Sequence, residues 1–343
     1  MSKVTQEVRD LIFHPEEVKA LTIEHLERLR AGKGTRGVPT GLPSIDKYLN
    51  PLVPGQLMVV LGRPSNGKTA LMAHYIREAA LRREAEGIYE TAPPIFVTAE
   101  MAVEEIQLRE LSHAIPLDSI KLYRGQIADW DEVFAAVEQV YEESPVIYLG
   151  HSIHSKGRRP RMSMQNIEKA ILMIRDEYDA PPEIVALDYA QRLRLDGKAR
   201  DRRLEVAEIV ERTKDLANLL PAPVLLGSQA GRQVEDRMPP IPDARDAKES
   251  GNLEETADVV VSVMRPSKYF EINEVIPKTN GLLCSEQLFF IKVIKQRMGE
   301  AGKGFWVYFD MALSMLADLE VDRYDLNSDE MERYNVTEEG YTD

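Results

Sequence analysis

Cysteine is almost absent from this chain of 343 residues, in which Cys284 stands alone. A single thiol excludes an intrachain disulfide framework and any metal site built from several cysteines. Long apolar runs are also absent, since none approaches the ~18 residues that a membrane-spanning helix needs. The first ten residues are charged and have no apolar segment of the kind that marks a signal peptide. We therefore expect a cytoplasmic protein without a membrane partner.

A positive charge balance is lacking as well, because 57 acidic residues outnumber 43 lysines and arginines and the formal net charge is −14. This balance argues against a uniformly basic surface for nucleic acid. The acidic residues are unevenly distributed, however, and residues 317–343 carry ten of them against Arg323 and Arg333. We expect that stretch to be a solvated, flexible tail. A groove lined locally by lysine and arginine remains compatible with the rest of the chain.

The most informative stretch is residues 57–69, where an apolar run leads into the pattern Gly-x-x-x-x-Gly-Lys-Thr. The pattern starts at Gly62 and ends at Thr69, and a helical pattern follows it. Strand, glycine-bounded loop and helix in this order are typical of a phosphate-binding loop, whose backbone N–H groups face the anion. Lys68 then neutralises phosphate charge, and the hydroxyl of Thr69 binds Mg²⁺. The sequence therefore predicts a site for a nucleoside triphosphate and Mg²⁺.

Short apolar runs alternate with helical patterns along most of the chain. Such alternation predicts an α/β fold with a mostly parallel sheet and helices on both of its faces. An amphipathic helix is also expected near the N-terminus, ahead of a glycine-rich linker. The predicted strands are 57–61, 95–99, 146–149, 184–187, 223–227, 259–264, 288–295 and 305–309, and the predicted helices are 15–31, 70–84, 102–112, 131–143, 163–178 and 204–219.

Polar residues close three of the predicted strands: Glu100, Asp188 and Gln229. Ligands of parallel sheets bind outside the carboxyl ends of strands, so these side chains should lie at the phosphate site. Asp188 fits the acidic residue that holds the Mg²⁺ shell, Glu100 could activate the attacking water, and Gln229 could hydrogen-bond the γ-phosphate. The bland alternative is that all three are solvated strand ends. The predicted nucleotide contacts are Gly62, Arg63, Pro64, Ser65, Asn66, Gly67, Lys68, Thr69, Ala70 and Asp188.

Two cations near the end of the chain, Lys295 and Arg297, are spaced by two residues. In an extended segment this spacing places both side chains on one face, where they could reach a phosphate together. The same spacing is equally compatible with a solvated pair. The pattern alone leaves both readings open.

Several segments, in order and over about residues 35–312, resemble the C-terminal motor domain of DnaB-type replicative helicases, which belong to the RecA-like superfamily 4. Any one of these segments is a weak match, whereas their order and spacing together are specific. The segments are Gly-Val-Pro-Thr-Gly (37–41), Arg-Pro-Ser-Asn-Gly-Lys-Thr (63–69), Thr-Ala-Glu-Met (98–101), Leu-Asp-Tyr-Ala-Gln (187–191), residues 201–209, residues 227–237, residues 248–260 and Ile-Lys-Gln-Arg-Met-Gly (294–299).

The resemblance implies a RecA-like P-loop ATPase with ATP and Mg²⁺ as its ligands. It implies that Glu100 is the catalytic glutamate, that Asp188 belongs to the metal site and that Gln229 senses the γ-phosphate. It also implies that Lys295 and Arg297 complete the site of a neighbouring subunit, as the family's trans-acting lysine and arginine finger. The family forms hexameric rings, so the resemblance implies a homo-oligomer.

The resemblance further implies contacts with single-stranded DNA, through Arg202 in a first loop and Lys248, Glu249 and Gly251 in a second. The family's loop usually carries arginine where this chain has Lys248, which keeps the charge but loses the bidentate fork. With no aromatic stacking platform visible, we expect backbone contacts that are independent of sequence. The predicted helix 15–31 resembles the family's linker helix, which docks on the adjacent protomer.

We expect three parts: 1–36 as linker helix and glycine-rich linker, 37–316 as the RecA-like motor, and 317–343 as the acidic tail. The family's N-terminal collar domain, which binds primase, is not expected here. A helicase loader or another replisome protein is therefore the expected partner besides DNA. The basic stretch 156–161 has the composition of a solvated loop.

The function expected from the resemblance is an ATP-dependent, ring-forming DNA helicase that acts on single-stranded DNA in replication, with 5′–3′ polarity. A nucleotide-controlled scaffold or loader, which assembles on DNA or a partner without unwinding, is the alternative. A recombinase of the RecA type is less favoured, because Phe13-His-Pro-Glu does not match its polymerisation segment.

Overall fold

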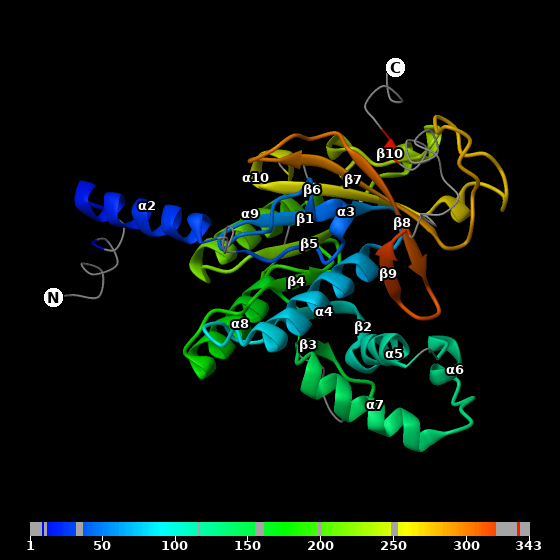
Figure 1. Ribbon diagram of the computed structural model, residues 1–343, viewed down its shortest axis with the longest axis horizontal. Coiled ribbons are helices and arrows are strands. Elements are labelled where there is room, and N and C mark those ends of the chain that lie inside the picture. Colours follow the sequence, from blue (N-terminus) through cyan, green and yellow to red (C-terminus); the bar gives the residue numbers. More distant parts are fainter. Residues whose placement is uncertain are drawn as a thin grey trace. The chain divides into compact units, whose positions relative to one another are not determined.

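The computed structural model describes residues 9, 12–31, 37–115, 117–154, 161–197, 201–247, 253–319 and 335–336. The chain divides into two compact units after Gly37, and Figure 1 shows the elements of each. None of the helices within the described ranges is both long enough and apolar enough to cross a membrane.

The first unit contains the helix α2 (Pro15–Arg30), which confirms the helix predicted over 15–31. Pro15 occupies its first turn, where a missing N–H is harmless, and Glu17 accepts a hydrogen bond from the His14 backbone at 2.7 Å. None of its residues, all of which are described, is buried within the chain. Its apolar residues are therefore exposed, among them Leu21 and Leu26.

The second unit is built on one sheet, whose ten described strands run in the order β10-β8-β7-β6-β1-β5-β4-β2-β3, with β9 paired to β8. The strands are β1 (Leu57–Gly62), β2 (Ile95–Ala102), β3 (Ile147–His151), β4 (Val185–Asp188), β5 (Val224–Gln229), β6 (Val259–Met264), β7 (Leu288–Gln296), β8 (Gly304–Asp310), β9 (Met315–Asp318) and β10 (Asn335–Val336). The helices are α3 (Pro43–Asp46), α4 (Lys68–Glu86), α5 (Val103–Ala114), α6 (Ser119–Tyr123), α7 (Trp130–Glu143), α8 (Met164–Tyr178), α9 (Arg202–Leu219) and α10 (Leu253–Thr256).

The strands from β6 to β3 in this order are joined by parallel pairs, whereas β7, β8, β9 and β10 pair antiparallel. The expected mostly parallel sheet with helices is thus confirmed. Strand β9 lies where the sequence suggested no strand, and it includes the first two residues of the stretch expected as a tail. It belongs to the sheet because Leu316 is buried and Asp318 accepts a hydrogen bond from the backbone of Ser44 at 2.8 Å. Of the remaining tail, only 319 and 335–336 are described.

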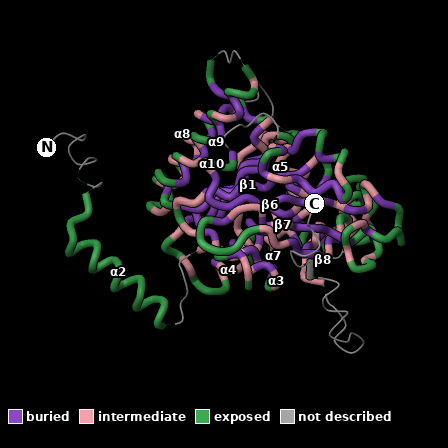
Figure 2. Tube along the Cα trace, turned by 90° about the horizontal axis from the view of Figure 1, so that it is seen from above, coloured by how far each residue is buried: buried purple, intermediate pink, exposed green. Residues whose placement is uncertain are grey.

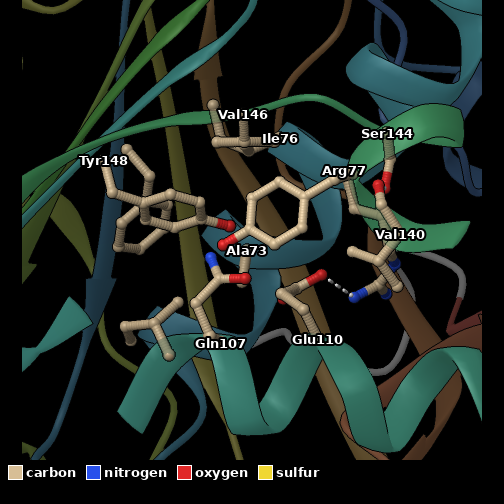
Figure 3. Close-up of a pocket in the computed structure, with 12 residues that line it drawn as sticks. Ala73, Ile76, Arg77, Gln107, Glu110, Val140, Ser144, Val146 and Tyr148 are labelled. Carbon is tan, nitrogen blue, oxygen red and sulfur yellow. Dashed lines mark hydrogen bonds and ion pairs between the residues drawn. The ribbon is translucent and has the colours of Figure 1, made fainter. Parts of the chain in front are cut away.

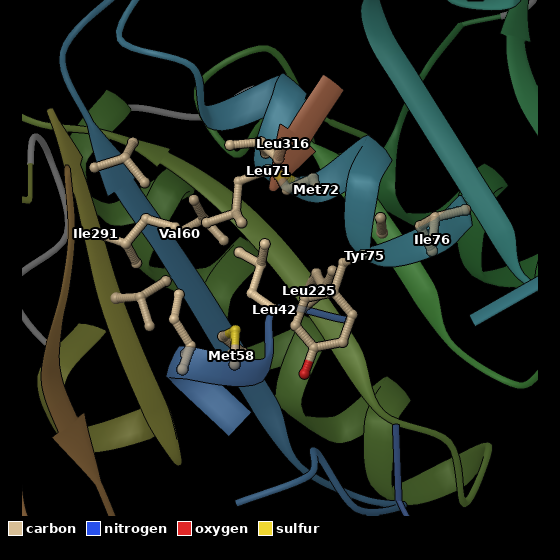
Figure 4. Close-up of a cluster of buried hydrophobic side chains, with 14 of the residues drawn as sticks. Leu42, Met58, Val60, Leu71, Met72, Tyr75, Ile76, Leu225, Ile291 and Leu316 are labelled. Atoms are coloured by element: carbon tan, nitrogen blue, oxygen red, sulfur yellow. The ribbon is translucent and has the colours of Figure 1, made fainter. Parts of the chain in front are cut away.

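Both faces of the sheet are covered, and β1 shows how. Its six residues are all buried, at the centre of the purple region in Figure 2. Because side chains alternate along a strand, Met58 and Val60 face α4 whereas Leu57 and Val59 face α8 and α9. Figure 4 shows the first of these two clusters, which α3 and α4 cover. Burial on both faces explains the continuous apolar runs that marked the parallel strands in the sequence.

The side chain of Phe289 on β7 joins the antiparallel strands to the core. It is fully buried, and its ring lies 5.3 Å from that of Phe309 on β8. We expect Phe289→Ala to lower the free energy of unfolding by about 3–5 kcal/mol, because it leaves a cavity in a close-packed core. Chemical denaturation measures this loss. Met173→Ala on the exposed side of α8 is the control, with an expected change within about 0.5 kcal/mol. Equal effects of the two substitutions would contradict this packing.

Candidate active site

The register of the sheet brings predicted site residues together at the carboxyl ends of neighbouring strands. Gly62 at the end of β1 lies beside Gln229 at the end of β5, and Thr98 on β2 lies beside Asp188 at the end of β4. The chain therefore turns into loops at the same level on four neighbouring strands. Parallel sheets of this kind bind their ligands at the carboxyl ends of their strands.

The loop between β1 and α4 has the backbone of a phosphate cup. Gly67 has a φ of +87°, and a Cβ at this position would lie 2.5 Å from a ring carbon of Phe289, so a side chain is excluded. The buried side chain of Asn66 braces the loop from below. It accepts a hydrogen bond from the Arg265 backbone at 2.9 Å and donates one to the Tyr269 hydroxyl at 3.0 Å. The cup is thus held in shape by the chain that follows β6.

Arg63, also in the cup, is directed away from its centre. Its guanidinium donates to the carbonyl of Ala230 at 3.0 Å and pairs with Glu235 at 2.7 Å. These contacts tie the cup to the segment after β5. Arg63 therefore stabilises the loop through its side chain, while its backbone remains part of the predicted phosphate contact.

Lys68 is buried inside the cup. Its Nζ donates to the carbonyls of Gly62 at 3.0 Å and Arg63 at 3.2 Å. Burial lowers the pKa of Lys68 to about 8, although the neighbouring Asp188 carboxylate opposes this shift. An ammonium group held in low dielectric without a full counter-charge is prepared for an anionic ligand.

Thr69 and Asp188 form the pair expected for Mg²⁺. The Thr69 hydroxyl donates to Asp188 Oδ2 at 2.7 Å. The second oxygen, Oδ1, is buried and has no hydrogen-bond partner within the described part of the chain. Burial raises the pKa of the Asp188 carboxyl. Carboxylate and hydroxyl oxygens are hard ligands, and a buried carboxylate oxygen without a partner is the donor that a bound cation would satisfy, so these residues fit Mg²⁺.

Glu100 and Gln229 flank this pair, and each is held by a residue that the sequence analysis missed. Arg192 forms an ion pair with Glu100 Oε1 at 3.0 Å. The side chain of Gln191 accepts a hydrogen bond from the Gln229 backbone at 3.0 Å. Both lie on the turn directly after Asp188. A signal was available, because residues that follow a strand end at the ligand edge lie at that same edge.

A cleft of about 1010 Å³ opens over these residues. Its lining includes Lys68, Thr69, Glu100, Asp188 and Gln229, together with residues of the β8–β9 hairpin and of the loop before β7. This volume is sufficient for a whole nucleotide.

A second, very small cavity of about 10 Å³ lies between α4, α5 and α7. Figure 3 shows the buried ion pair beside it, in which Arg77 on α4 contacts Glu110 on α5 at 3.0 Å. Burial, reinforced by the Arg77 charge, lowers the pKa of His74 on α4 to about 3, so this histidine is neutral. A space of this size holds a single water at most. The cluster therefore fastens α5 to the cup helix and does not bind a ligand.

Lys295 and Arg297 are the predicted site residues that the structure does not bring to the cup. Their strand, β7, runs antiparallel to β6, and Gln296 is level with Val259 and Met58. Four residues of strand, or about 13 Å, separate that level from Gly62. Lys295 Nζ donates to the Ala257 carbonyl at 2.7 Å, and Arg297 pairs with Asp258 at 3.0 Å. Both cations thus lie near the amino ends of β1 and β6, whereas their own cup follows the carboxyl end of β1.

The expected DNA contacts are described only in part. Arg202 is the first residue of α9, and its guanidinium donates to the carbonyls of Gln191 at 2.7 Å and Leu193 at 3.1 Å and pairs with Glu205. These contacts brace the turn that carries Gln191 and Arg192. Lys248, Glu249 and Gly251 lie outside the described residues, as does most of the basic stretch 156–161.

A phosphate cup after the central strand of a parallel sheet, with an aspartate closing β4, defines a P-loop nucleotide-binding protein with a RecA-like fold. Residues 37–315 match the model of the DnaB-like helicase C-terminal domain. The chain belongs to this family, which confirms the resemblance seen in the sequence.

Relatives of known name agree with this assignment. The replicative DNA helicase DnaB of Leifsonia xyli is 32% identical over 272 residues, which cover 78% of this chain and 55% of the relative. That of Pasteurella multocida is 30% identical over 260 residues, which cover 74% and 51%. The chain thus spans about half the length of the curated relatives it matches.

Two solved structures show the same fold. One is an ATPase domain, which superposes with a TM-score of 0.73 and 21% identity, over 90% of this chain and all of that one. The other is a DnaB-like replicative helicase, described with its interactions with primase, which superposes with a TM-score of 0.71 and 22% identity, over 90% and 68%. At this level of identity the two likenesses establish the fold alone.

Replacing Lys68 tests whether its ammonium group is buried in the cup. Between pH 8 and 10.5 the unfolded chain still holds a proton that the folded Lys68 has lost, so the free energy of unfolding rises with pH over this window. Lys68→Met should lack this rise. It should also stabilise the nucleotide-free protein at pH 7, by roughly 1–3 kcal/mol, because no buried ammonium remains. Denaturant unfolding at several pH values compares the two proteins, and parallel pH profiles would contradict the burial of this charge.

Proposed function

We propose that this chain is the motor part of an ATP-dependent, ring-forming DNA helicase that acts on single-stranded DNA during replication. The observation that carries the proposal is the distance between the cup and the two cations. The cup follows the carboxyl end of β1, whereas Lys295 and Arg297 lie at the opposite end of the same strands. A single copy cannot bring both to one triphosphate. A second copy, placed with its Lys295 and Arg297 against the cup of the first, would complete the site.

The residues at the cup have the chemistry that phosphoryl transfer to water requires. Lys68 and the loop N–H groups hold the β- and γ-phosphates, and Thr69 and Asp188 hold Mg²⁺. When bound, the metal neutralises charge on the phosphate oxygens. Glu100 orients and deprotonates the attacking water, and Gln229 hydrogen-bonds the γ-phosphate. Lys295 and Arg297 of the neighbour stabilise the charge on the transferred group.

Membership of the family and the names of the relatives support a hexameric ring and single-stranded DNA as the partner. We assign DNA contacts to Arg202 in the first loop and to Lys248, Glu249 and Gly251 in the second. Contacts of this kind hold the phosphate backbone and weaken with salt. Residues 37–318 would form the motor, since β9 ends at Asp318. Residues 1–36 would link it to an adjacent protomer, and the residues after β9 would form the acidic tail. A helicase loader or another replisome protein is the further partner that we propose, and we place the protein in the cytoplasm.

Arg297→Ala tests the shared site. Nucleotide binding should remain nearly intact, because the side chain does not reach its own cup, whereas turnover should fall by ~10³-fold or more. Mixing this variant with Lys68→Ala protein should restore part of the activity, since an intact cup of one variant then meets an intact finger of the other. ATP hydrolysis measured across mixing ratios decides the point. Absence of recovery at every ratio would place the site within one subunit.

Stimulation by DNA tests the motor itself. ATP turnover should increase when single-stranded DNA is added, and the increase should weaken with salt because the contacts are to phosphates. Strand displacement on a forked duplex should require ATP and intact Glu100. Turnover that is indifferent to DNA would contradict the proposal. Oligomerisation driven by ATP without strand displacement would instead identify a scaffold or loader.

A further inference from the structure

Arg192 is the residue that holds the side chain of Glu100. Its guanidinium approaches Glu100 Oε1 to 3.0 Å, from the turn that follows Asp188. On the same turn, the ring of Tyr189 lies 5.5 Å from Lys68 Nζ. Arg192 therefore lies among the groups that surround the phosphates, although no part of the cup motif includes it.

An ion pair of this kind restrains a carboxylate that has to act on water. One oxygen of Glu100 is occupied by the guanidinium, so the carboxylate cannot use that oxygen to orient a water molecule while the pair is formed. The pair is also weak enough to open, because the Glu100 and Arg192 side chains are 42% and 53% exposed. Exposed pairs shift a population by about fivefold at most. Such a contact can be formed in one state of the motor and lost in another.

Arg202 connects this pair to the first DNA loop. Its guanidinium donates to the carbonyls of Gln191 and Leu193, the residues on either side of Arg192. Arg202 thus grips the backbone of the turn at two points around Arg192. A DNA phosphate that draws the Arg202 guanidinium away removes both hydrogen bonds and leaves the turn free to move.

We propose that Arg192 is a positioning residue that restrains Glu100 until DNA engages Arg202. The proposal rests on the proposed function, since it needs Glu100 as the base and Arg202 at DNA. In the chain without DNA, the Arg192–Glu100 pair keeps hydrolysis slow. When a phosphate takes Arg202, the turn relaxes, the pair opens and Glu100 becomes available to the attacking water. The stimulation of hydrolysis by DNA then follows from the release of a single ion pair.

The test compares ATP turnover with and without single-stranded DNA in variants of the full chain. Arg192→Ala should raise the kcat measured without DNA by about two- to fivefold, with KM unchanged, and should lower the stimulation ratio by the same factor. Arg192→Lys keeps the charge and should fall between wild type and Arg192→Ala. Arg175→Ala is the matched control, because Arg175 also forms an exposed ion pair, with Asp176 at 2.6 Å, but lies near the C-terminal end of α8. It should leave the kcat without DNA as in wild type.

The double variant Arg192→Ala/Glu100→Gln separates the possible outcomes. It should be as inactive as Glu100→Gln alone, since Arg192 acts through Glu100. An unchanged or lower kcat without DNA in Arg192→Ala overturns the inference, and so does an equal rise in Arg175→Ala. If Glu100→Gln keeps wild-type turnover, the assignment of the base in the proposed function fails. If Glu100→Gln is inactive while Arg192→Ala behaves as wild type, the positioning role alone fails.

Discussion

The rest of this molecule depends on one constraint: β1 is covered on both faces and is hydrogen-bonded to a neighbouring strand on each side. The strand lies between β5 and β6, and every residue along it is inside the core. The strands paired with β1 in parallel run in its direction. The loops that follow these strands therefore all leave the sheet at the same end. The cup, Asp188 and Gln229 lie together for this reason, although more than a hundred residues separate the cup from either of them in the chain. The site is a consequence of the register of the sheet.

The same core keeps the cup in a state that is unfavourable without its ligand. Lys68 is buried with a lowered pKa, and a buried oxygen of Asp188 has no partner within the described residues. Asn66 and Phe289 hold the loop around these groups, so the loop cannot relax to solvate them. Under the proposed function, bound phosphates and a cation would recover the stability that these buried groups cost. Preorganisation of this kind is how a site favours charge that develops during reaction.

The sequence was sufficient where local pattern decides structure. The cup followed from Gly62 to Thr69, and the sheet followed from apolar runs, because strands buried on both faces cannot be polar. Strand β9 was missed because its one buried apolar residue, Leu316, gives no periodicity. The contacts of Arg192 with Glu100 and of Asn66 with Tyr269 join residues 92 and 203 positions apart. No local rule contains such pairs, since tertiary packing alone brings them together. The spacing of two cations likewise could not show that their strand runs antiparallel and ends at the far edge.

Strand β7 runs from the cup toward the two cations that we propose act on a neighbouring subunit. Near its start, Phe289 fills the space beneath Gly67 in the cup, and at its end the chain reaches Lys295 and Arg297. About 23 Å of hydrogen-bonded backbone lies between Phe289 and Gln296. In the ring proposed above, this strand would span each subunit from its own cup to the cup that its Lys295 and Arg297 would complete in the neighbour. A displacement of Phe289 on nucleotide binding would then reach the neighbouring site along one hydrogen-bonded strand.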